Sequence, residues 1–450
     1  MAAAQTEHEV PKSMLSIHYL RNNFTSHTGP FSAIAELIDN AYDPDVNAKQ
    51  IWIDKTQIRD MECLTFRDDG NGLSRDLMHQ MLSYGFSNKK ALNGKLPIGM
   101  YGSGFQNGSM HLGKDVLILS KSKDDLCVGM LSQTYLEKTG SNVMLVPIIS
   151  FKKQEENNGM RENQASLRDI REHSPFKTEE VLLTEFQAIE GPTGTKIIIW
   201  NLRRTSEGHR KLDFNTENDI RIPCDDSDTS DTSDTSVPER NSSLRAYCSI
   251  LYLKPSMKIN IRGQRVENCP IDESLESIDR SFNYQPRAVK RKIPITFGYT
   301  TQSIQHYGLM MYYKNRLIKA YHRVGCQLND KNRRSIGVIG VIECNYLTPT
   351  PNKEDFVYDD TNRNTFLSLG NKLNVYSKKR RLNPSDIVPT QETDGERTQD
   401  NDQLQEVEQL EGEKASLSEE CKQTKAQLTK LTAWRKGMEA QFNKAPEEEP

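Results

Sequence analysis

The chain has 450 residues, of which 35% are hydrophobic and 27% are charged, and its formal net charge is −3. This composition argues against a chain that is disordered throughout, and the length predicts two or three folded domains. No apolar run approaches about eighteen residues, so a membrane-spanning helix is not expected, and nucleic acid could bind only through local basic patches.

The N-terminal residues and the cysteines bear on secretion and on metal binding. Met1–Met14 lacks the charged-then-apolar pattern of a signal peptide, so we expect no secretory leader. The eight cysteines lie singly and form no CxxC pair, which predicts reduced thiols rather than a zinc site.

Residues 14–205 have the pattern of one mixed domain, in which short apolar strands alternate with helical segments and glycine-rich turns. The strands expected there are Gln50–Asp54, Cys63–Arg67, Val116–Leu119 and Thr195–Trp200.

Residues 222–243 contain a low-complexity acidic tract of Ser, Thr and Asp, which cannot build a core and predicts a disordered loop. Residues 244–376 resume the pattern of a folded domain. Its expected strands are Met257–Ile261, Ile293–Gly298 and Ser335–Cys344.

A polar linker is expected over residues 377–402, and its first basic run, Lys378–Arg381, is a candidate nuclear import signal. Apolar residues then recur at spacings of three and four over residues 403–442, which predicts a coiled coil. A lone amphipathic helix that packs on the body of the protein is the alternative.

The first motif that carries chemistry lies in Phe31–Asn40, an expected helix. Glu36 and Asn40 are one turn apart on the same face. A carboxylate can orient an attacking water, and an amide oxygen can bind Mg²⁺. Taken alone, such a pair is more often solvated surface.

The second motif is Phe66–Gly72, which follows an apolar strand. The Asp68 carboxylate can accept hydrogen bonds from the exocyclic amino group of adenine, and Gly70 and Gly72 let the backbone approach the base. A plain turn is the alternative. A calcium loop is disfavoured because the later glutamate of an EF-hand is missing.

The third motif is the glycine-rich segment Pro97–Phe105, which contains Gly99, Gly102 and Gly104. Such a turn exposes backbone N–H groups that can surround phosphates, above all where a helix follows. No GK[ST] sequence follows, so it is not a P-loop, and the kinase motifs HRD and DFG are absent.

Together the three motifs resemble the GHKL superfamily of gyrase B, MutL and histidine-kinase ATPases, whose fourth motif follows at Gly191–Ile199. Three longer segments, residues 26–54, 244–255 and 310–328, are similar to the microrchidia (MORC) family. The resemblance covers about residues 14–376. It implies an α+β chain: a GHKL (Bergerat) ATPase sandwich, a ribosomal-S5-like α/β transducer domain and the C-terminal coiled coil.

The resemblance also implies roles for individual residues. Glu36 would be the general base, Asn40 the Mg²⁺ ligand, Asp68 the adenine acceptor, and Lys353 the transducer lysine that reaches the terminal phosphate of ATP. A lid would span about residues 85–107. The other nucleotide contacts implied are Gly70, Gly72, Ser87, Gly99, Gly102, Ser103, Gly104, Phe105, Gln106 and Thr195.

The chain departs from the family pattern at three places. Gln106 stands where a lysine is usual, and the loss of one transition-state contact costs roughly 10²–10³-fold in turnover. Asp69 stands where Asn is usual. Residues 377–402 hold no Cys or Trp, so the CW zinc finger and its reading of histone tails are not expected here.

Two segments interleave basic and aromatic residues, Tyr284–Lys292 and Tyr312–Arg323, the second followed by Lys331, Arg333 and Arg334. They are either contacts for DNA phosphates or strands with one solvated face. With the resemblance, they predict a nuclear, ATP-dependent homodimer that acts on double-stranded DNA or chromatin, in compaction or gene silencing, with no membrane partner. The alternative is an ATP-binding switch or pseudoenzyme with little turnover, serving as a coiled-coil scaffold.

Overall fold

The computed structural model describes residues 29–381, apart from short gaps. The gaps are residues 86–88, 90, 93–96, 100, 142, 152–156, 224–238, 270, 272–273, 288, 301–306 and 329–336. Ser87, residues 14–28, most of the linker, the coiled coil predicted at 403–442 and the basic residues at 331–334 therefore lie outside the described residues.

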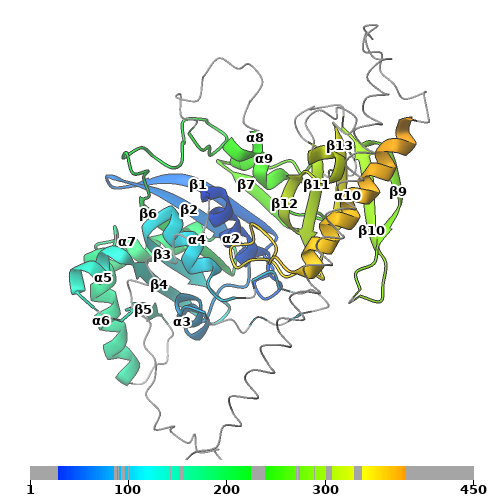
Figure 1. The fold of residues 1–450 in the computed structure, drawn as a ribbon. Helices are drawn as coiled ribbons and strands as arrows, with labels where there is room; N and C mark the ends of the chain where they lie inside the picture. The colour runs from blue at the N-terminus through cyan, green and yellow to red at the C-terminus, as the bar shows by residue number, and fades with distance from the viewer. Residues whose placement is uncertain are drawn as a thin grey trace, which may run out of the picture. The chain divides into compact units, whose positions relative to one another are not determined.

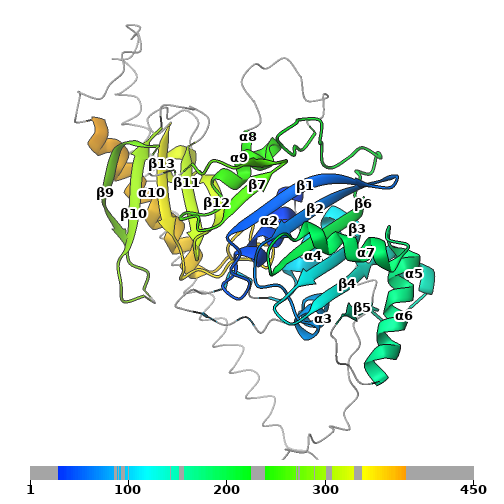
Figure 2. The same ribbon diagram turned by 180° about the vertical axis from the view of Figure 1, so that it is seen from behind.

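The first sheet has eight strands in the order β5-β4-β3-β6-β2-β1-β7-β8 (Figures 1 and 2). Neighbouring strands are antiparallel except β1 and β7, which are parallel. The bounds are β1 Gln50–Ile58, β2 Met61–Asp68, β3 Gly113–Lys121, β4 Leu126–Ser132, β5 Ile148–Ser150, β6 Gly194–Leu202, β7 Lys258–Ile261 and β8 Gln264–Arg265.

Helices cover both faces of this sheet because successive strand residues point to opposite sides. On β6, Ile197 and Ile199 join the core beneath α2, α3 and α4, whereas Ile198 and Trp200 join the core on the other face. The first group of helices is α2 Pro30–Tyr42, α3 Arg75–Leu82 and α4 Gly104–Leu112. The second is α5 Gln133–Thr139, α6 Asn157–His173, α7 Glu179–Thr184 and η1 Glu185–Ala188.

The second sheet has five strands in the order β12-β11-β13-β10-β9. Helix α10 (Asp360–Arg381) packs Leu369, Leu373 and Tyr376 on one face of it. The other face packs against Ile250, directly after α9 (Leu244–Ser249). The remaining bounds are α8 Glu239–Ser242, β9 Glu276–Tyr284, β10 Ile293–Tyr299, β11 Gly308–Tyr313, β12 Arg316–His322, η3 Gly325–Leu328 and β13 Val338–Glu343.

Every strand named from the sequence is confirmed, but the predicted division at residue 244 does not follow the sheets. Residues 258–265 form β7 and β8, which extend the first sheet beyond β1. The reason is local: Ile259 and Ile261 are buried against the edge of β1, and the sequence does not reveal which sheet an isolated short strand joins.

Two other predicted boundaries need correction. The predicted disordered loop at 222–243 is too wide, because Ile222 donates a backbone hydrogen bond to Ser242 and α8 begins at Glu239. The predicted linker begins too early, because α10 continues to Arg381 and carries the whole basic run.

Of the residues described, none belongs to a helix long and apolar enough to cross a membrane.

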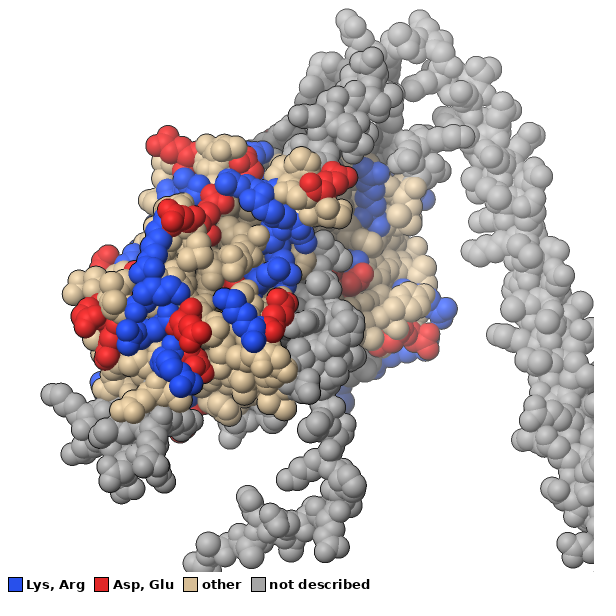
Figure 3. All heavy atoms as spheres, turned by 90° about the vertical axis from the view of Figure 1, so that its left-hand side faces the viewer, with Lys and Arg blue, Asp and Glu red and all other residues tan. Residues whose placement is uncertain are grey.

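Charge is unevenly spread over the first sheet and its helices. The face at the left of Figure 1, seen directly in Figure 3, shows Lys and Arg side chains around a hollow of uncharged surface, with acidic side chains among them.

Candidate active site

Helix α2 carries four polar side chains at spacings of three or four, namely Glu36, Asp39, Asn40 and Asp43, the last at its C-cap. The helix begins at Pro30, whose fixed φ suits a first helical position. Glu36, Asp39 and Asp43 expose only 3%, 1% and 0% of their surface. Carboxylates this buried require partners, and the partners define the site.

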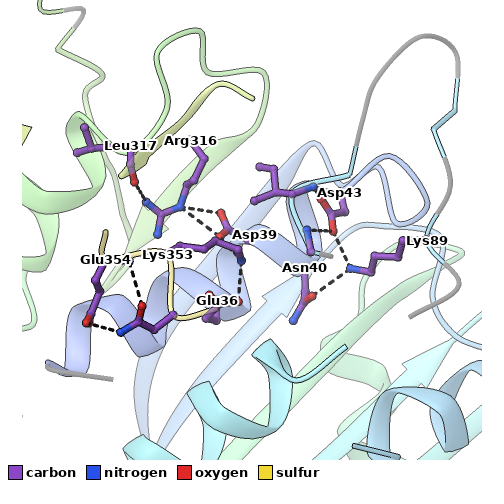
Figure 4. A network of polar contacts seen from close by, with 12 residues as sticks. Glu36, Asp39, Asn40, Asp43, Lys89, Arg316, Leu317, Lys353 and Glu354 are labelled. Atoms are coloured by element: carbon purple, nitrogen blue, oxygen red, sulfur yellow. Dashed lines mark hydrogen bonds and ion pairs between the residues drawn. The ribbon is translucent and has the colours of Figure 1, made fainter. Parts of the chain in front are cut away.

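Glu36 and Asp39 are both bound by Lys353 (Figure 4). The Lys353 ammonium donates to Glu36 Oε2 at 2.7 Å and to Asp39 Oδ2 at 3.1 Å. Burial alone would lower the pKa of Lys353, but the two carboxylates more than reverse that effect and hold the pKa above its ordinary value. Lys353 lies on the loop before α10 with φ 54°, a conformation that is uncommon for a residue other than glycine.

Asp39 also accepts hydrogen bonds from the second sheet. Arg316 Nε, at the start of β12, lies 3.0 and 3.2 Å from the two Asp39 oxygens, and the Tyr252 hydroxyl donates to Oδ1 at 2.8 Å. Burial would raise the pKa of Asp39, but Arg316 and Lys353 hold it below the ordinary value. Asp39 therefore joins α2 to two segments more than 200 residues later in the chain.

Asp43 ties the segment around the third motif to the end of α2. Its carboxylate accepts the backbone N–H groups of Ile98 at 2.6 Å and Gly99 at 3.1 Å, and the Lys89 ammonium at 2.7 Å. The same ammonium donates to Asn40 Oδ1 at 3.1 Å, as Figure 4 shows.

The surroundings of the Asn40 amide oxygen are compatible with binding of a hard cation. Its amide oxygen accepts a hydrogen bond from a cationic group, the Lys89 ammonium, at 3.1 Å, so this oxygen already lies beside a positive charge. No cluster of three or more acidic, His or Cys side chains suited to a metal occurs among the described residues. Mg²⁺ at Asn40 would therefore take its other ligands from phosphate oxygens and water, which is its usual behaviour with nucleotides.

Asp68 lies at the end of β2, opposite Thr195 of β6. Its Oδ1 accepts the backbone N–H of Gly70 at 2.9 Å, and the Thr195 hydroxyl lies 3.4 Å from that of Ser120. Burial raises the pKa of Asp68 to about 7. The neighbouring Asp69 has a different role, because its Oδ1 accepts the backbone N–H groups of Lys49 at 2.7 Å and of Gln50, the first residue of β1, at 2.8 Å.

The glycines of the motifs lie where a side chain would collide. A Cβ on Gly104 would come within 2.2 Å of Glu36 Oε2, and one on Gly72, whose φ is +70°, within 2.2 Å of the Lys121 carbonyl. Ser103 is the N-cap residue of α4, and Phe105 is buried behind it. The close approach of Gly104 to Glu36 brings the third motif against the first.

A cavity of about 390 Å³ opens between these elements, a size that suits a small-molecule ligand. Of the residues expected from the sequence, Glu36, Asn40, Gly72, Gly99, Gly102, Gly104, Phe105 and Lys353 line it. Asp68, Gly70, Ser103 and Thr195 are not among its lining residues.

Gln106 is placed differently from what the resemblance implies. Its side chain is fully buried, and its amide nitrogen lies 3.5 Å from the carbonyl of Met81 in α3, outside the cavity lining. Lys89, which sequence analysis missed, is instead a basic side chain that lines the cavity. The sequence offered no signal for it beyond its place within the expected lid.

The basic segment Tyr312–Arg323 makes mostly internal contacts, which favours the strand over the DNA-binding surface of the two alternatives for these side chains. Arg316 is buried with Asp39, Lys319 pairs with Asp355 at 2.7 Å, and Lys314 donates to the Pro97 carbonyl at 3.2 Å. In the other segment, Arg287, Arg291 and Lys292 are exposed.

Two family models match the chain. Residues 27–165 match the family described as histidine kinase-, DNA gyrase B-, and HSP90-like ATPase, and residues 242–378 match the Morc6 ribosomal protein S5 domain 2-like family. Both domain types expected from the sequence are thereby confirmed.

Curated relatives agree with these matches. The chain is 50% identical to the mouse (Mus musculus) MORC family CW-type zinc finger protein 3, over 86% of the chain and 42% of that protein. It is 35% identical to the Arabidopsis thaliana Protein MICRORCHIDIA 3, over 79% of the chain and 67% of that protein. It is 28% identical to mouse ATPase MORC2B, over 82% of the chain and 43% of that protein. The chain thus spans roughly half the length of the relatives it matches.

Proposed function

Because the chain belongs to the microrchidia (MORC) family and carries its GHKL ATPase domain, we propose that it hydrolyses ATP in the cavity beneath α2 and uses ATP to dimerise on chromatin. The observation that carries the proposal is the meeting of Glu36 and Lys353, 317 residues apart in sequence, at one wall of that cavity.

Glu36 is the general base in this proposal. Its Oε2 is held by Lys353, and its Oε1 is buried without a hydrogen-bond partner in the part of the chain that is described. That second oxygen is available to accept a proton from an attacking water. A side chain at position 104 would collide with the same carboxylate, so glycine there leaves room for it.

Lys353 has two positions in the proposed cycle. Without nucleotide it neutralises Glu36 and Asp39. With nucleotide it moves its charge to the terminal phosphate, where negative charge develops, and so releases Glu36 to act as a base. Asn40 and the phosphates would hold Mg²⁺, which would neutralise part of the phosphate charge. Arg316 stays on Asp39 throughout and keeps that buried carboxylate paired.

In this proposal, contacts with the second domain transmit nucleotide binding in the cavity to the rest of the molecule. Tyr101 and Lys314 link residues around the third motif to the second domain, through the carbonyls of Pro349 and Pro97. We propose that closing of this segment over ATP joins two chains. The exposed basic residues of Tyr284–Lys292 then contact DNA, and the run at 378–381 directs the chain to the nucleus, with compaction or silencing of chromatin as the outcome.

The test is phosphate release from ATP by the purified chain beside Glu36→Ala, with and without duplex DNA. Removing a general base should lower turnover by roughly 10²–10⁴-fold while ATP still binds. Glu190→Ala is the matched control, because the Glu190 side chain is 82% exposed and should leave turnover unchanged.

A second outcome would favour a different function. If neither the natural chain nor Glu36→Ala releases phosphate while both bind ATP, the protein is an ATP-binding switch. Gln106 first suggested that alternative. If Gln106 is the cause, a Gln106→Lys variant gains turnover. Because Gln106 lies outside the cavity lining, we expect no gain, which would count against Gln106 as the cause.

A further inference from the structure

A second cavity, of about 570 Å³, lies on the ATPase domain away from the nucleotide site. It is formed by the turn between β1 and β2, the start of β3, the end of β6 and residues 203–214. Helix α4 separates the two cavities: Gly104 at its first residue lines the nucleotide cavity, whereas Leu112 at its last lines this one. The two cavities share no lining residue, so each can be altered independently.

The rim of this cavity is basic. Five of its lining side chains are Lys or Arg and two are Asp or Glu. One of the acids, Glu62, is already bound by Lys55 at 2.6 Å and Arg210 at 3.4 Å. Lys114 and Lys211 have no carboxylate partner within the described part of the chain. Basic side chains therefore outnumber acidic ones in the lining of this cavity.

Arg203 is the most informative member of the rim. Its guanidinium is partly buried and hydrogen bonds only to neutral acceptors, the Met110 carbonyl at 3.1 Å and Gln133 Oε1 at 2.8 Å. No carboxylate forms an ion pair with it among the residues described. Burial lowers the pKa of Arg203, against the nearby charges of Asp115 and Glu137, which act on it through space without pairing with it. Two hydrogen bonds hold the guanidinium in place, so its remaining donors are available to an anion.

The floor and one wall of the cavity are of a different kind. Leu112, Leu212 and Phe214 form an apolar floor and are nearly buried. In the wall, the Thr134 hydroxyl donates to the buried carboxylate of Asp115 at 2.8 Å, and Asn201 donates to the same group at 2.5 Å. The cavity is thus held in shape before any ligand arrives, which lowers the cost of binding.

We propose that this cavity binds an acidic peptide segment of a partner protein that carries one or two apolar side chains. Arg203 takes one carboxylate in the two-pronged geometry that guanidinium and carboxylate favour. Lys114 and Lys211 hold a second carboxylate at the rim, and the apolar side chain covers Leu212 and Phe214. Duplex DNA fits less well, because its phosphates cannot use the apolar side chains of the cavity.

The test uses fluorescence anisotropy with the full chain and three fluorescein-labelled probes. They are the peptide Glu-Asp-Leu-Phe-Glu-Asp, the same peptide with Gln and Asn in place of its acids, and a 20-base-pair duplex. We expect the acidic peptide to bind and the neutral peptide to bind at least about tenfold more weakly, as the loss of charged hydrogen bonds requires.

Two substitutions locate the binding. Arg203→Gln and Lys114→Glu should each weaken the acidic peptide about tenfold or more. Lys114 is exposed and has no ion-pair partner among the residues that the structure describes, so its variant should fold even if Arg203→Gln does not. Arg363→Gln, at an exposed site on α10, should leave peptide binding unchanged. ATP binding should be the same in Lys114→Glu as in the natural chain.

The proposal fails if the natural chain binds the neutral peptide as well as the acidic one, or binds neither. It also fails if Lys114→Glu binds the acidic peptide as the natural chain does. If the duplex binds and loses as much affinity as the peptide in both variants, the face is a nucleic-acid surface and not a peptide site.

Discussion

The Lys89 ammonium occupies the junction of Asn40, Asp43 and Gly99, at the end of the cavity where phosphates are expected. Gln106 supplies no charge there. We therefore predict that Lys89→Met weakens ATP binding about tenfold or more, since it removes a charged contact, and that AMP binding changes far less. Titration calorimetry with both nucleotides measures this.

The controls for this prediction separate charge from shape. Lys89→Arg should recover much of the ATP affinity, and Lys49→Met, an exposed change outside the cavity, should have no effect. Equal weakening of ATP and AMP by Lys89→Met would show that Lys89 only anchors the backbone around Asp43.

The raised pKa of Asp68 predicts a pH dependence of nucleotide binding. With a pKa of about 7, the carboxylate is mostly protonated at pH 6 and mostly ionised at pH 8. The ionised form is the better acceptor for an adenine amino group, so ATP affinity should rise about tenfold from pH 6 to pH 8. Asp68→Asn removes this titration. If its pH profile matches that of the natural chain, Asp68 does not contact the base.

At this scale the sequence predicted part of the site. The motifs and the resemblance pointed to Glu36, Asn40, Asp68 and Lys353, but not to the partners that hold them. Asp39 and Asp43 were visible as acids on an otherwise apolar helix, which is a usable signal, because buried carboxylates need partners. Arg316 could not be found, since its contact with Asp39 spans 277 residues.

Helix α2 connects the first sheet to the second through buried ion pairs. Its Asp39 binds Arg316 of the second sheet and Lys353 of the loop before α10, and the side chains of all three residues are buried. We predict that Arg316→Gln lowers the free energy of unfolding by about 3–5 kcal/mol, because it breaks a buried ion pair from one side. Denaturant unfolding followed by circular dichroism measures the loss.

A matched change on the same strand should cost little. Lys319→Gln breaks the pair with Asp355, whose side chain is 52% exposed, and should lower the free energy of unfolding by about 1 kcal/mol or less. If the two variants lose equal stability, the contact between Asp39 and Arg316 is not the tie that joins α2 to β12.

Strand periodicity was a reliable guide to the elements themselves but not to their pairing. The alternation of Lys258–Ile261 predicted a strand, and the structure has one. Its partner β1, however, comes about 200 residues earlier in the sequence. Pairing between distant segments depends on which sheet edge offers matching buried positions, and local sequence holds no record of that.

For the whole molecule we predict that ATP drives dimerisation without the predicted coiled coil. Light scattering should show a doubled mass with ATP and Mg²⁺, both for the full chain and for a chain lacking residues 403–450. Glu36→Ala should remain dimeric longer after ATP addition, because hydrolysis reopens the dimer. Self-association that ignores ATP and vanishes on deletion of 403–450 would instead identify a coiled-coil scaffold.

The pairing of β7 with β1 has a consequence for how the protein is made. β1 begins at Gln50, and its neighbour on that side ends at Ile261, so about 200 further residues must be synthesised before the sheet is complete. At typical rates of about 5–20 residues per second, the edge of β1 stays open on the ribosome for roughly 10–40 s. An open edge strand is a site of mispairing, so the nascent chain should depend on ribosome-associated chaperones until β7 emerges.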